Sequence, residues 1–136
     1  VFGEKDAQQV FLVQRMVRDL DIRTRIDVVE TVRADDGLAL SSRNAYLDER
    51  HRRAASSIPQ ALEAAQSAAD RGIDAIVAAA QGVLMGATEV ELDYFAVVRP
   101  DTFQPVDDDH RGPARALIAA RVGSTRLIDT ALLHLG

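Results

Sequence analysis

Apolar residues recur at helical spacing in residues 9–20, near the start of the chain. The stripe consists of residues three or four positions apart and two that widen it: Val10, Val13, Val17 and Leu20, and Phe11 and Met16. This periodicity predicts a surface helix that packs on a sheet. Residues 2–3 before it and 22–32 after it, where β-branched residues gather, are typical of strands. A strand, a helix and a strand in this order predict the end of a parallel α/β unit.

Turn-forming residues interrupt this pattern, and a helical region follows. Asp-Asp-Gly at residues 35–37 is typical of a turn, and residues 41–46 are expected to form a polar loop. Asp48 can cap the next helix, Pro59 should kink or divide it, and Gly72 can end it. The buried face of this helical region is predicted to be rich in alanine: Ala54, Ala55, Ile58, Ala61, Leu62, Ala65, Ala68 and Ala69.

The rest of the chain reads as one more helix and three strands. Asp74 is expected to cap the helix, whose inner face would carry five apolar residues: Ile76, Val77, Ala80, Val83 and Leu84. Residues 90–99, 115–122 and 125–129 have the composition of strands, and Gly-Ser at residues 123–124 predicts a two-residue hairpin turn. This half of the chain is therefore predicted to be an α+β domain, with helices packed on a small antiparallel sheet.

Composition limits the classes of function. The 136 residues are 47% hydrophobic and 27% charged, which is typical of a soluble globular protein. A formal net charge of −5 argues against nucleic-acid or anionic-membrane partners, although a local group of cations can still bind phosphate. The chain has no cysteine, and His51, His110 and His134 lack the paired spacing of zinc ligands. No apolar run approaches the roughly 20 residues that span a bilayer, so a cytoplasmic location is expected.

Two polar clusters carry the candidate chemistry. Gly-Glu-Lys-Asp at residues 3–6 stands where a strand turns into a helix, and Ser-Ser-Arg-Asn at residues 41–44 follows the Gly-containing turn. In the second cluster the hydroxyls can donate hydrogen bonds, and Arg43 can grip phosphate oxygens in bidentate fashion. In the first, Gly3 allows close backbone approach, and Lys5 is unfavourable at the positive end of a helix dipole unless an anion is near. Each cluster alone is typical of solvated surface; together they favour an ATP site.

In this order and at this spacing the two clusters resemble the pantothenate synthetase family, the pantoate–β-alanine ligases. Residues 3–9 match the block Gly-Glu-Lys-Asp-x-x-Gln, and residues 32–47 match Val-Arg-x-x-Asp-Gly-Leu-Ala-x-Ser-Ser-Arg-Asn-x-Tyr-Leu. The likeness continues through residues 94–95, 115–122 and 125–129, so it covers essentially the whole chain. The chain departs from the family pattern at two apolar positions, where the family usually has an aromatic residue and Met: Ala7 and Leu40.

The resemblance implies a fold and a domain boundary. Residues 1–31 would be the end of a nucleotide-binding Rossmann-like domain, and residues 32–136 a C-terminal α+β lid domain. The chain has no His-x-Gly-His, the motif of the family's nucleotide-binding half. It is therefore expected to be the C-terminal portion of the enzyme and inactive alone.

The resemblance also implies an activity: ATP-dependent condensation of pantoate with β-alanine through a pantoyl-adenylate, a step toward coenzyme A. By this likeness, ATP would be contacted by Gly3, Glu4, Lys5, Asp6, Val32, Leu40, Ser41, Ser42 and Arg43. Of these, Lys5, Ser41, Ser42 and Arg43 would act in catalysis, and Gln9 would bind pantoate. Mg²⁺ would arrive with ATP and take its protein ligand from outside this chain, and the full-length enzyme would be a homodimer.

Two other functions stay open on the sequence. The chain could be a non-catalytic interaction or oligomerisation domain, with an apolar contact patch near residues 10–11. It could also be part of a related nucleotidyltransferase that acts on another acid. The acidic run at residues 107–110, three aspartates and a histidine, could recruit a divalent cation, but such polar loops are more often simply solvated.

Overall fold

The computed structural model describes residues 2–3, 7–20, 28–29, 31–39 and 41–136. At the start of the chain, strand β1 (Phe2–Gly3) pairs in parallel with β2 (Val28–Val29), and helix α1 (Ala7–Asp19) lies between them in sequence. The predicted strand, helix and strand are thus present in parallel order. The part of the second predicted strand at residues 22–27 and 30 lies outside the described residues. That this unit ends a Rossmann-like domain stays a prediction.

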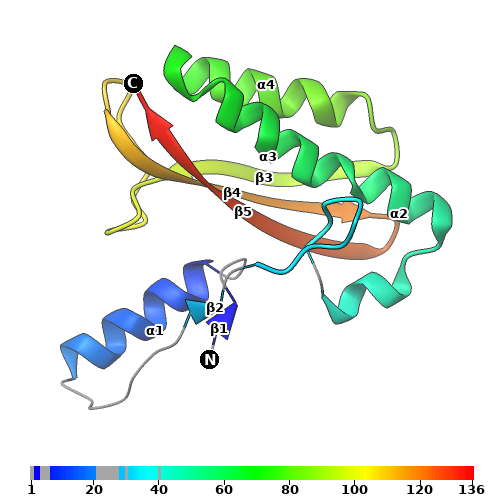
Figure 1. The fold of residues 1–136 in the computed structure, drawn as a ribbon, viewed down its shortest axis with the longest axis horizontal. Coiled ribbons are helices and arrows are strands. Elements are labelled where there is room, and N and C mark those ends of the chain that lie inside the picture. The colour runs from blue at the N-terminus through cyan, green and yellow to red at the C-terminus, as the bar shows by residue number, and fades with distance from the viewer. Residues whose placement is uncertain (1, 4–6, 21–27, 30, 40) are drawn as a thin grey trace.

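The larger part of the chain is an antiparallel sheet covered by helices. Helices α3 and α4 lie along one face of the sheet, and α1 lies on its other side (Figure 1). The strands are ordered β3-β4-β5, so β5 is an edge strand. The elements are η1 (Ser42–Tyr46), α2 (Glu49–Ala55), α3 (Ser57–Ser67), η2 (Ala69–Arg71), α4 (Ile73–Met85), β3 (Val90–Val98), β4 (Gly112–Val122) and β5 (Thr125–Leu135). This arrangement confirms the predicted α+β half.

Local sequence signals explain most of the helix ends. Asp48 caps α2, because its Oδ1 accepts a hydrogen bond from the backbone N–H of His51 at 2.8 Å. The helical region divides at Ser56, as expected from Pro59, whose ring would clash with the carbonyl of Ala55 in a continuous helix.

The predicted cap of α4 is wrong. Gly72 occupies the cap position with a φ of 97°, and the helix begins at Ile73, so Asp74 lies in its first turn. Glycine adopts a positive φ without the steric penalty of a Cβ atom, so the chain can turn into α4 at Gly72. Among the residues that the structure describes, no side chain caps this helix start. Asp74 still carries its negative charge near the positive end of the helix.

The hydrophobic core fills the space between the helices and one face of the sheet. On β4 the core positions alternate: Ala114, Ala116, Ile118, Ala120 and Val122. Alanine faces them from α3, where Ala61 and Ala65 are fully buried. Small side chains on both surfaces allow helix and sheet to approach closely, and three large residues fill the remaining volume: Ile58, Ile76 and Leu133.

The last two strands are longer than predicted. Strand β4 begins at Gly112 and β5 continues to Leu135, and the two pair along their whole length around the hairpin turn at residues 123–124. The sequence resemblance ended at residue 129, but Leu133 and Leu135 continue the buried alternation of β5. Pairing therefore extends as far as apolar burial continues.

Helix α1 packs through its first turns on the loop that follows β3. Ala7 and Val10 are buried, and the ring of Phe11 stacks on that of Phe103 with centroids 4.7 Å apart. Phe103 has a φ of 56°, a left-handed conformation that costs an L-residue about 1–2 kcal/mol. The stack with Phe11 therefore stabilises an unfavourable backbone beside α1.

Another face of α1 carries exposed apolar side chains, two of which, Met16 and Leu20, belong to the predicted stripe. Leu12, Met16 and Leu20 are at least half exposed and lie four residues apart, so they share one face. The apolar patch expected at residues 10–11 is largely covered by the chain itself, because Val10 is buried and Phe11 is half-buried against Phe103. Within the described part of the chain, no helix has the length and apolar character needed to cross a membrane.

Candidate functional site

A cleft of about 490 Å³ lies between the first turn of α1 and the sheet. It is lined by residues of α1, all three strands and the loop after β3: Ala7, Gln8, Gln9, Tyr94, Phe103, Leu117, Ile118, Arg126, Ile128 and Asp129. Gln9, predicted to bind pantoate, is exposed and borders this cleft. The volume is typical of a site for a small molecule, and its walls combine apolar rings with a few polar groups.

Arg126 is the one cation that lines the cleft among the described residues. Its Nε donates to Asp93 Oδ2 at 2.9 Å, and its guanidinium lies 6.0 Å from the centroid of the Tyr94 ring. Both members of the ion pair are nearly half exposed, so the pair adds little stability. The guanidinium therefore stays accessible to an anion. The sequence assigned Arg126 no role; its position two residues after the hairpin turn was the available signal.

The Ser-Ser-Arg-Asn segment forms a short 3-10 helix, where the sequence predicted a loop. Ser41 caps it by accepting a hydrogen bond from the backbone N–H of Arg43 at 3.2 Å. Arg43 Nη1 in turn donates to the backbone carbonyl of Arg126 at 3.1 Å. The segment is thus attached to β5 at the residue whose side chain borders the cleft.

Two cavities border the same residues near the start of β5. A second cavity of about 20 Å³ is bordered by Ser41, Arg43 and Asn44, and it shares Ile128 and Asp129 with the cleft. Residues from the two sequence clusters therefore border the same part of β5: Gln9 of α1 lines the cleft, and Ser41 and Arg43 line the small cavity.

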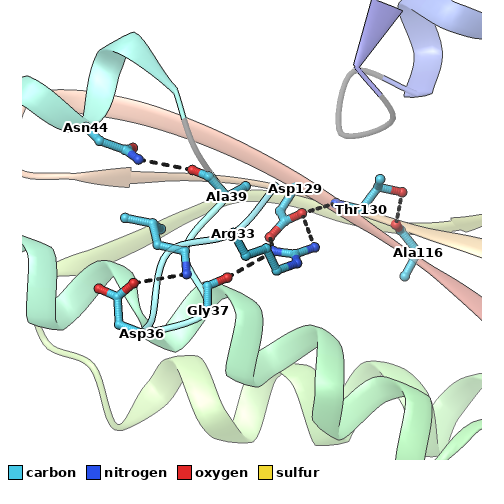
Figure 2. Close-up of polar contacts among 9 residues, drawn as sticks. Arg33, Asp36, Gly37, Ala39, Asn44, Ala116, Asp129 and Thr130 are labelled. Carbon is cyan, nitrogen blue, oxygen red and sulfur yellow. Dashed lines mark hydrogen bonds and ion pairs between the residues drawn. The ribbon is translucent and has the colours of Figure 1, made fainter. Parts of the chain in front are cut away.

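A partly buried ion pair, in which Asp129 is buried and Arg33 is one-third exposed, lies beside both cavities (Figure 2). Arg33 Nη1 donates to Asp129 Oδ2 at 2.6 Å, and its Nη2 donates to Asp129 Oδ1 at 2.9 Å. The backbone N–H of Thr130 donates to Asp129 Oδ1 at 2.8 Å, and Asp129 is only 3% exposed. Both carboxylate oxygens are occupied. Sequence reasoning missed this pair, whose members are 96 positions apart.

Asn44 ties the segment to the chain before it. Its Nδ2 donates to the carbonyl of Ala39 at 3.0 Å, while its buried Oδ1 has no partner among the described residues (Figure 2). A cavity of about 20 Å³ borders this side chain, which is enough for one water molecule.

Several predicted ATP contacts lie outside the described residues or are described only in part. Glu4, Lys5, Asp6 and Leu40 are outside, and Gly3 belongs to β1 through its backbone. For Ser42 the backbone position in η1 is described. The side chain of Val32 is on the surface, 58% exposed, which leaves its backbone available to a ligand. Contact of these residues with ATP stays a prediction.

The described residues form no cluster of side chains that could bind a metal ion. No group of three His, Asp or Glu side chains is placed to hold a metal ion in this part of the chain. At the acidic run, His110 Nε2 lies 3.0 Å from the carbonyl of Pro113. Next to the cleft, Asp129 is bound by Arg33, and Asp93 is paired with Arg126. These two carboxylates beside the cleft are therefore engaged by arginines rather than arranged around a cation.

Comparison with known sequences gives one family. A family model described as Pantoate-beta-alanine ligase matches residues 1–132. The pantothenate synthetase of Leifsonia xyli subsp. xyli (strain CTCB07) is 53% identical over 129 residues, which are 95% of this chain and 45% of that protein. The chain spans about half the length of the curated relatives it matches.

Solved structures agree with the sequence comparison. The pantothenate synthetase from Thermus thermophilus aligns with a TM-score of 0.88 at 41% identity, over 96% of this chain and 48% of that one. The pantoate-beta-alanine ligase from Francisella tularensis, solved in complex with beta-gamma ATP and beta-alanine, aligns with a TM-score of 0.64 at 29% identity, over 96% and 42%. In both cases the likeness extends along nearly the whole of this chain.

Proposed function

This chain belongs to the pantoate-beta-alanine ligase family, and we propose that it is the C-terminal portion of an enzyme that condenses pantoate with β-alanine by using ATP. The observation that supports the proposal is that Gln9 borders the cleft while Ser41 and Arg43 border a small cavity at the same residues of β5, Ile128 and Asp129. A relative of the same family was solved with an ATP compound and β-alanine. The domain boundary near Thr31, between a Rossmann-like domain and a C-terminal lid, is part of the proposal.

The reaction has two steps. In the first, a carboxylate oxygen of pantoate attacks the α-phosphorus of ATP, the bond to the β-phosphate breaks, and pyrophosphate leaves. In the second, the amine of β-alanine attacks the carbonyl carbon of pantoyl-adenylate, a C–N bond forms, and AMP leaves as the amine loses a proton. The first step spreads negative charge over phosphoryl oxygens, so fixed cations and hydrogen-bond donors stabilise its transition state.

The residues of this chain suit that first step. Arg43 presents a guanidinium that can bind phosphate in bidentate fashion, and Ser41 and Ser42 supply hydroxyl donors. Lys5 would add a charge at the start of α1, where backbone N–H groups also favour anions. Gln9 would hold pantoate across the cleft. Contacts of ATP with Gly3, Glu4, Asp6, Val32 and Leu40 complete the proposed site.

The remaining components come from outside this chain. Mg²⁺ bound to ATP would neutralise charge at the phosphates, and its protein ligand would lie on another part of the enzyme. The full-length enzyme is proposed to be a cytoplasmic homodimer, and this chain alone to be inactive. The negative net charge argues against nucleic acid or an anionic membrane as partners.

The test uses the full-length enzyme and the variant Arg43→Ala, with Arg53→Ala on the exposed side of α2 as control. Loss of one preorganised donor at a phosphoryl group lowers the rate about 10²–10³-fold. We therefore expect pantoate-dependent pyrophosphate release to fall by that factor in Arg43→Ala and to be unchanged in Arg53→Ala.

Each alternative function predicts a different result. Pyrophosphate release with other acids but not with pantoate would favour a related nucleotidyltransferase. No ATP-dependent reaction and no ATP binding in the wild-type enzyme would favour an interaction domain. Wild-type pyrophosphate release in Arg43→Ala would remove Arg43 from the site.

A further inference from the structure

We propose that Arg33 and Asp129 act as a positioning pair, which holds the segment carrying Ser41 and Arg43 in the geometry that phosphate binding requires. This inference rests on the proposed function. Neither residue is assigned to touch ATP or pantoate; they would act through residues 41–44.

Three hydrogen bonds fix the relative orientation of the Arg33 and Asp129 side chains. Two parallel N–H···O bonds of 2.6 and 2.9 Å join the planar guanidinium of Arg33 to the carboxylate of Asp129. A third donor, the backbone N–H of Thr130, fixes the carboxylate from within β5 at 2.8 Å. The Thr130 hydroxyl donates to the carbonyl of Ala116 on the neighbouring strand at 2.8 Å, which ties this part of β5 to β4. The pair is therefore anchored on the sheet.

The position of Asp129 argues for a role beyond packing. Asp129 lies opposite Ile118 in the sheet register and alternates with Leu127 and Ala131, so it occupies the face of β5 that packs on the core. An apolar residue would fill that position without the cost of burying a charge. Both carboxylate oxygens already accept hydrogen bonds, so Asp129 is not available as a general base. A buried acid whose oxygens are both used is suited to holding its partner.

The pair is connected to the phosphate segment by a short series of contacts (Figure 2). Arg33 Nη1 also donates to the carbonyl of Gly37 at 3.1 Å, and the backbones of Arg33 and Ala39 form an antiparallel bridge. The carbonyl of Ala39 accepts from Asn44 Nδ2, and Asn44 lies next to Arg43 in η1. Arg33 thus contacts the turn before the segment directly, and it is linked to Asn44, the residue after Arg43, through Ala39.

A second arginine provides a matched control. Arg52 on α2 donates from its Nε to Asp36 Oδ2 at 3.2 Å, so it contacts the same turn at a different residue. Both members of that pair are about one-third exposed or more at the side chain, and neither borders the cleft or the smaller cavity. Lysine in place of either arginine keeps the charge and removes the planar fork of donors. Arg33→Lys and Arg52→Lys therefore differ mainly in which anchor is weakened.

The experiment measures structure and activity separately in the full-length enzyme. Backbone hydrogen exchange of Arg43 and Asn44 without nucleotide is expected to be about 10-fold faster in Arg33→Lys, the effect of one weakened charge-assisted hydrogen bond, and unchanged in Arg52→Lys. Pyrophosphate release should fall at least about 10-fold in Arg33→Lys. The reaction of preformed pantoyl-adenylate with β-alanine should fall less, because the β- and γ-phosphates have left. A purely structural role would lower both half-reactions equally.

Three outcomes would overturn the positioning role: wild-type exchange at Arg43 and Asn44 in folded Arg33→Lys, equal loss in both half-reactions, or the same effects in Arg52→Lys. If Arg33→Lys does not fold, Asp129→Glu replaces it, because it keeps the charge and both acceptors but displaces Arg33. Wild-type exchange in that variant would equally overturn the proposal. A wild-type enzyme that releases no pyrophosphate would refute the proposed function, while the exchange comparison would still decide the positioning role.

Discussion

Replacement of Asp129 by asparagine isolates the charge of the buried pair, because the two side chains have nearly the same shape. In Asp129→Asn the amide oxygen can still accept from the backbone N–H of Thr130. The new amide group, however, would face a guanidinium N–H of Arg33, so a donor would meet a donor where the contact is now 2.6 Å. Arg33 would also lose its counter-charge.

The expected loss of stability follows from the exposure of the two partners. Breaking a fully buried ion pair costs about 3–5 kcal/mol, because an uncompensated charge stays buried. The side chain of Asp129 is 2% exposed, but that of Arg33 is 33% exposed, so water can partly solvate the remaining guanidinium. We therefore expect the free energy of unfolding to fall by about 2–3 kcal/mol.

Urea unfolding followed by circular dichroism measures this change. With an unchanged slope, the midpoint should fall by roughly 1–2 M urea. Asp93→Asn is the matched control: its pair with Arg126 has similar chemistry, but the two side chains are 46% and 42% exposed, so its loss should stay below about 1 kcal/mol. Equal losses in the two variants would refute the argument that burial of Asp129 makes its pair strong.

Two further changes test the helical layer. The backbone N–H of His51 lowers the pKa of the Asp48 carboxyl, so the ionised cap stabilises the fold above the unfolded pKa of about 3.9 and loses this effect as pH falls through the folded pKa. Thermal melts of wild type and Asp48→Asn should differ at neutral pH and converge in acid; a pH-independent difference would contradict this. Ile76→Ala should lower the free energy of unfolding by about 2–5 kcal/mol, because Ile76 is fully buried. In the same urea assay Met85→Ala, at a position 84% exposed, should change it by less than about 0.5 kcal/mol, and similar losses in both would contradict the assigned core.

The sequence alone determined the elements whose signals are local. Helical periodicity identified α1, Asp48 and Pro59 identified a helix start and a helix break, and the Gly-Ser pair identified the hairpin of β4 and β5. Each depends on residues within a few positions of one another, where backbone sterics and capping act. The same local blocks carried the family resemblance, and with it the interest in Gln9, Ser41 and Arg43.

Tertiary structure decided how the site is held together. From the sequence, Asp129 was only one residue of a short predicted strand. The structure shows that it shares the buried alternation of Leu127 and Leu133 and that it pairs with Arg33, 96 positions earlier. Arg126 likewise became part of the candidate site only because the hairpin and α1 meet at one cleft. The physical reason is that an ion pair or a cleft depends on distance in space, and the packing of α1 and of residues 31–39 against the sheet sets those distances. Local sequence signals fix where the chain turns, and long-range packing fixes which charges meet.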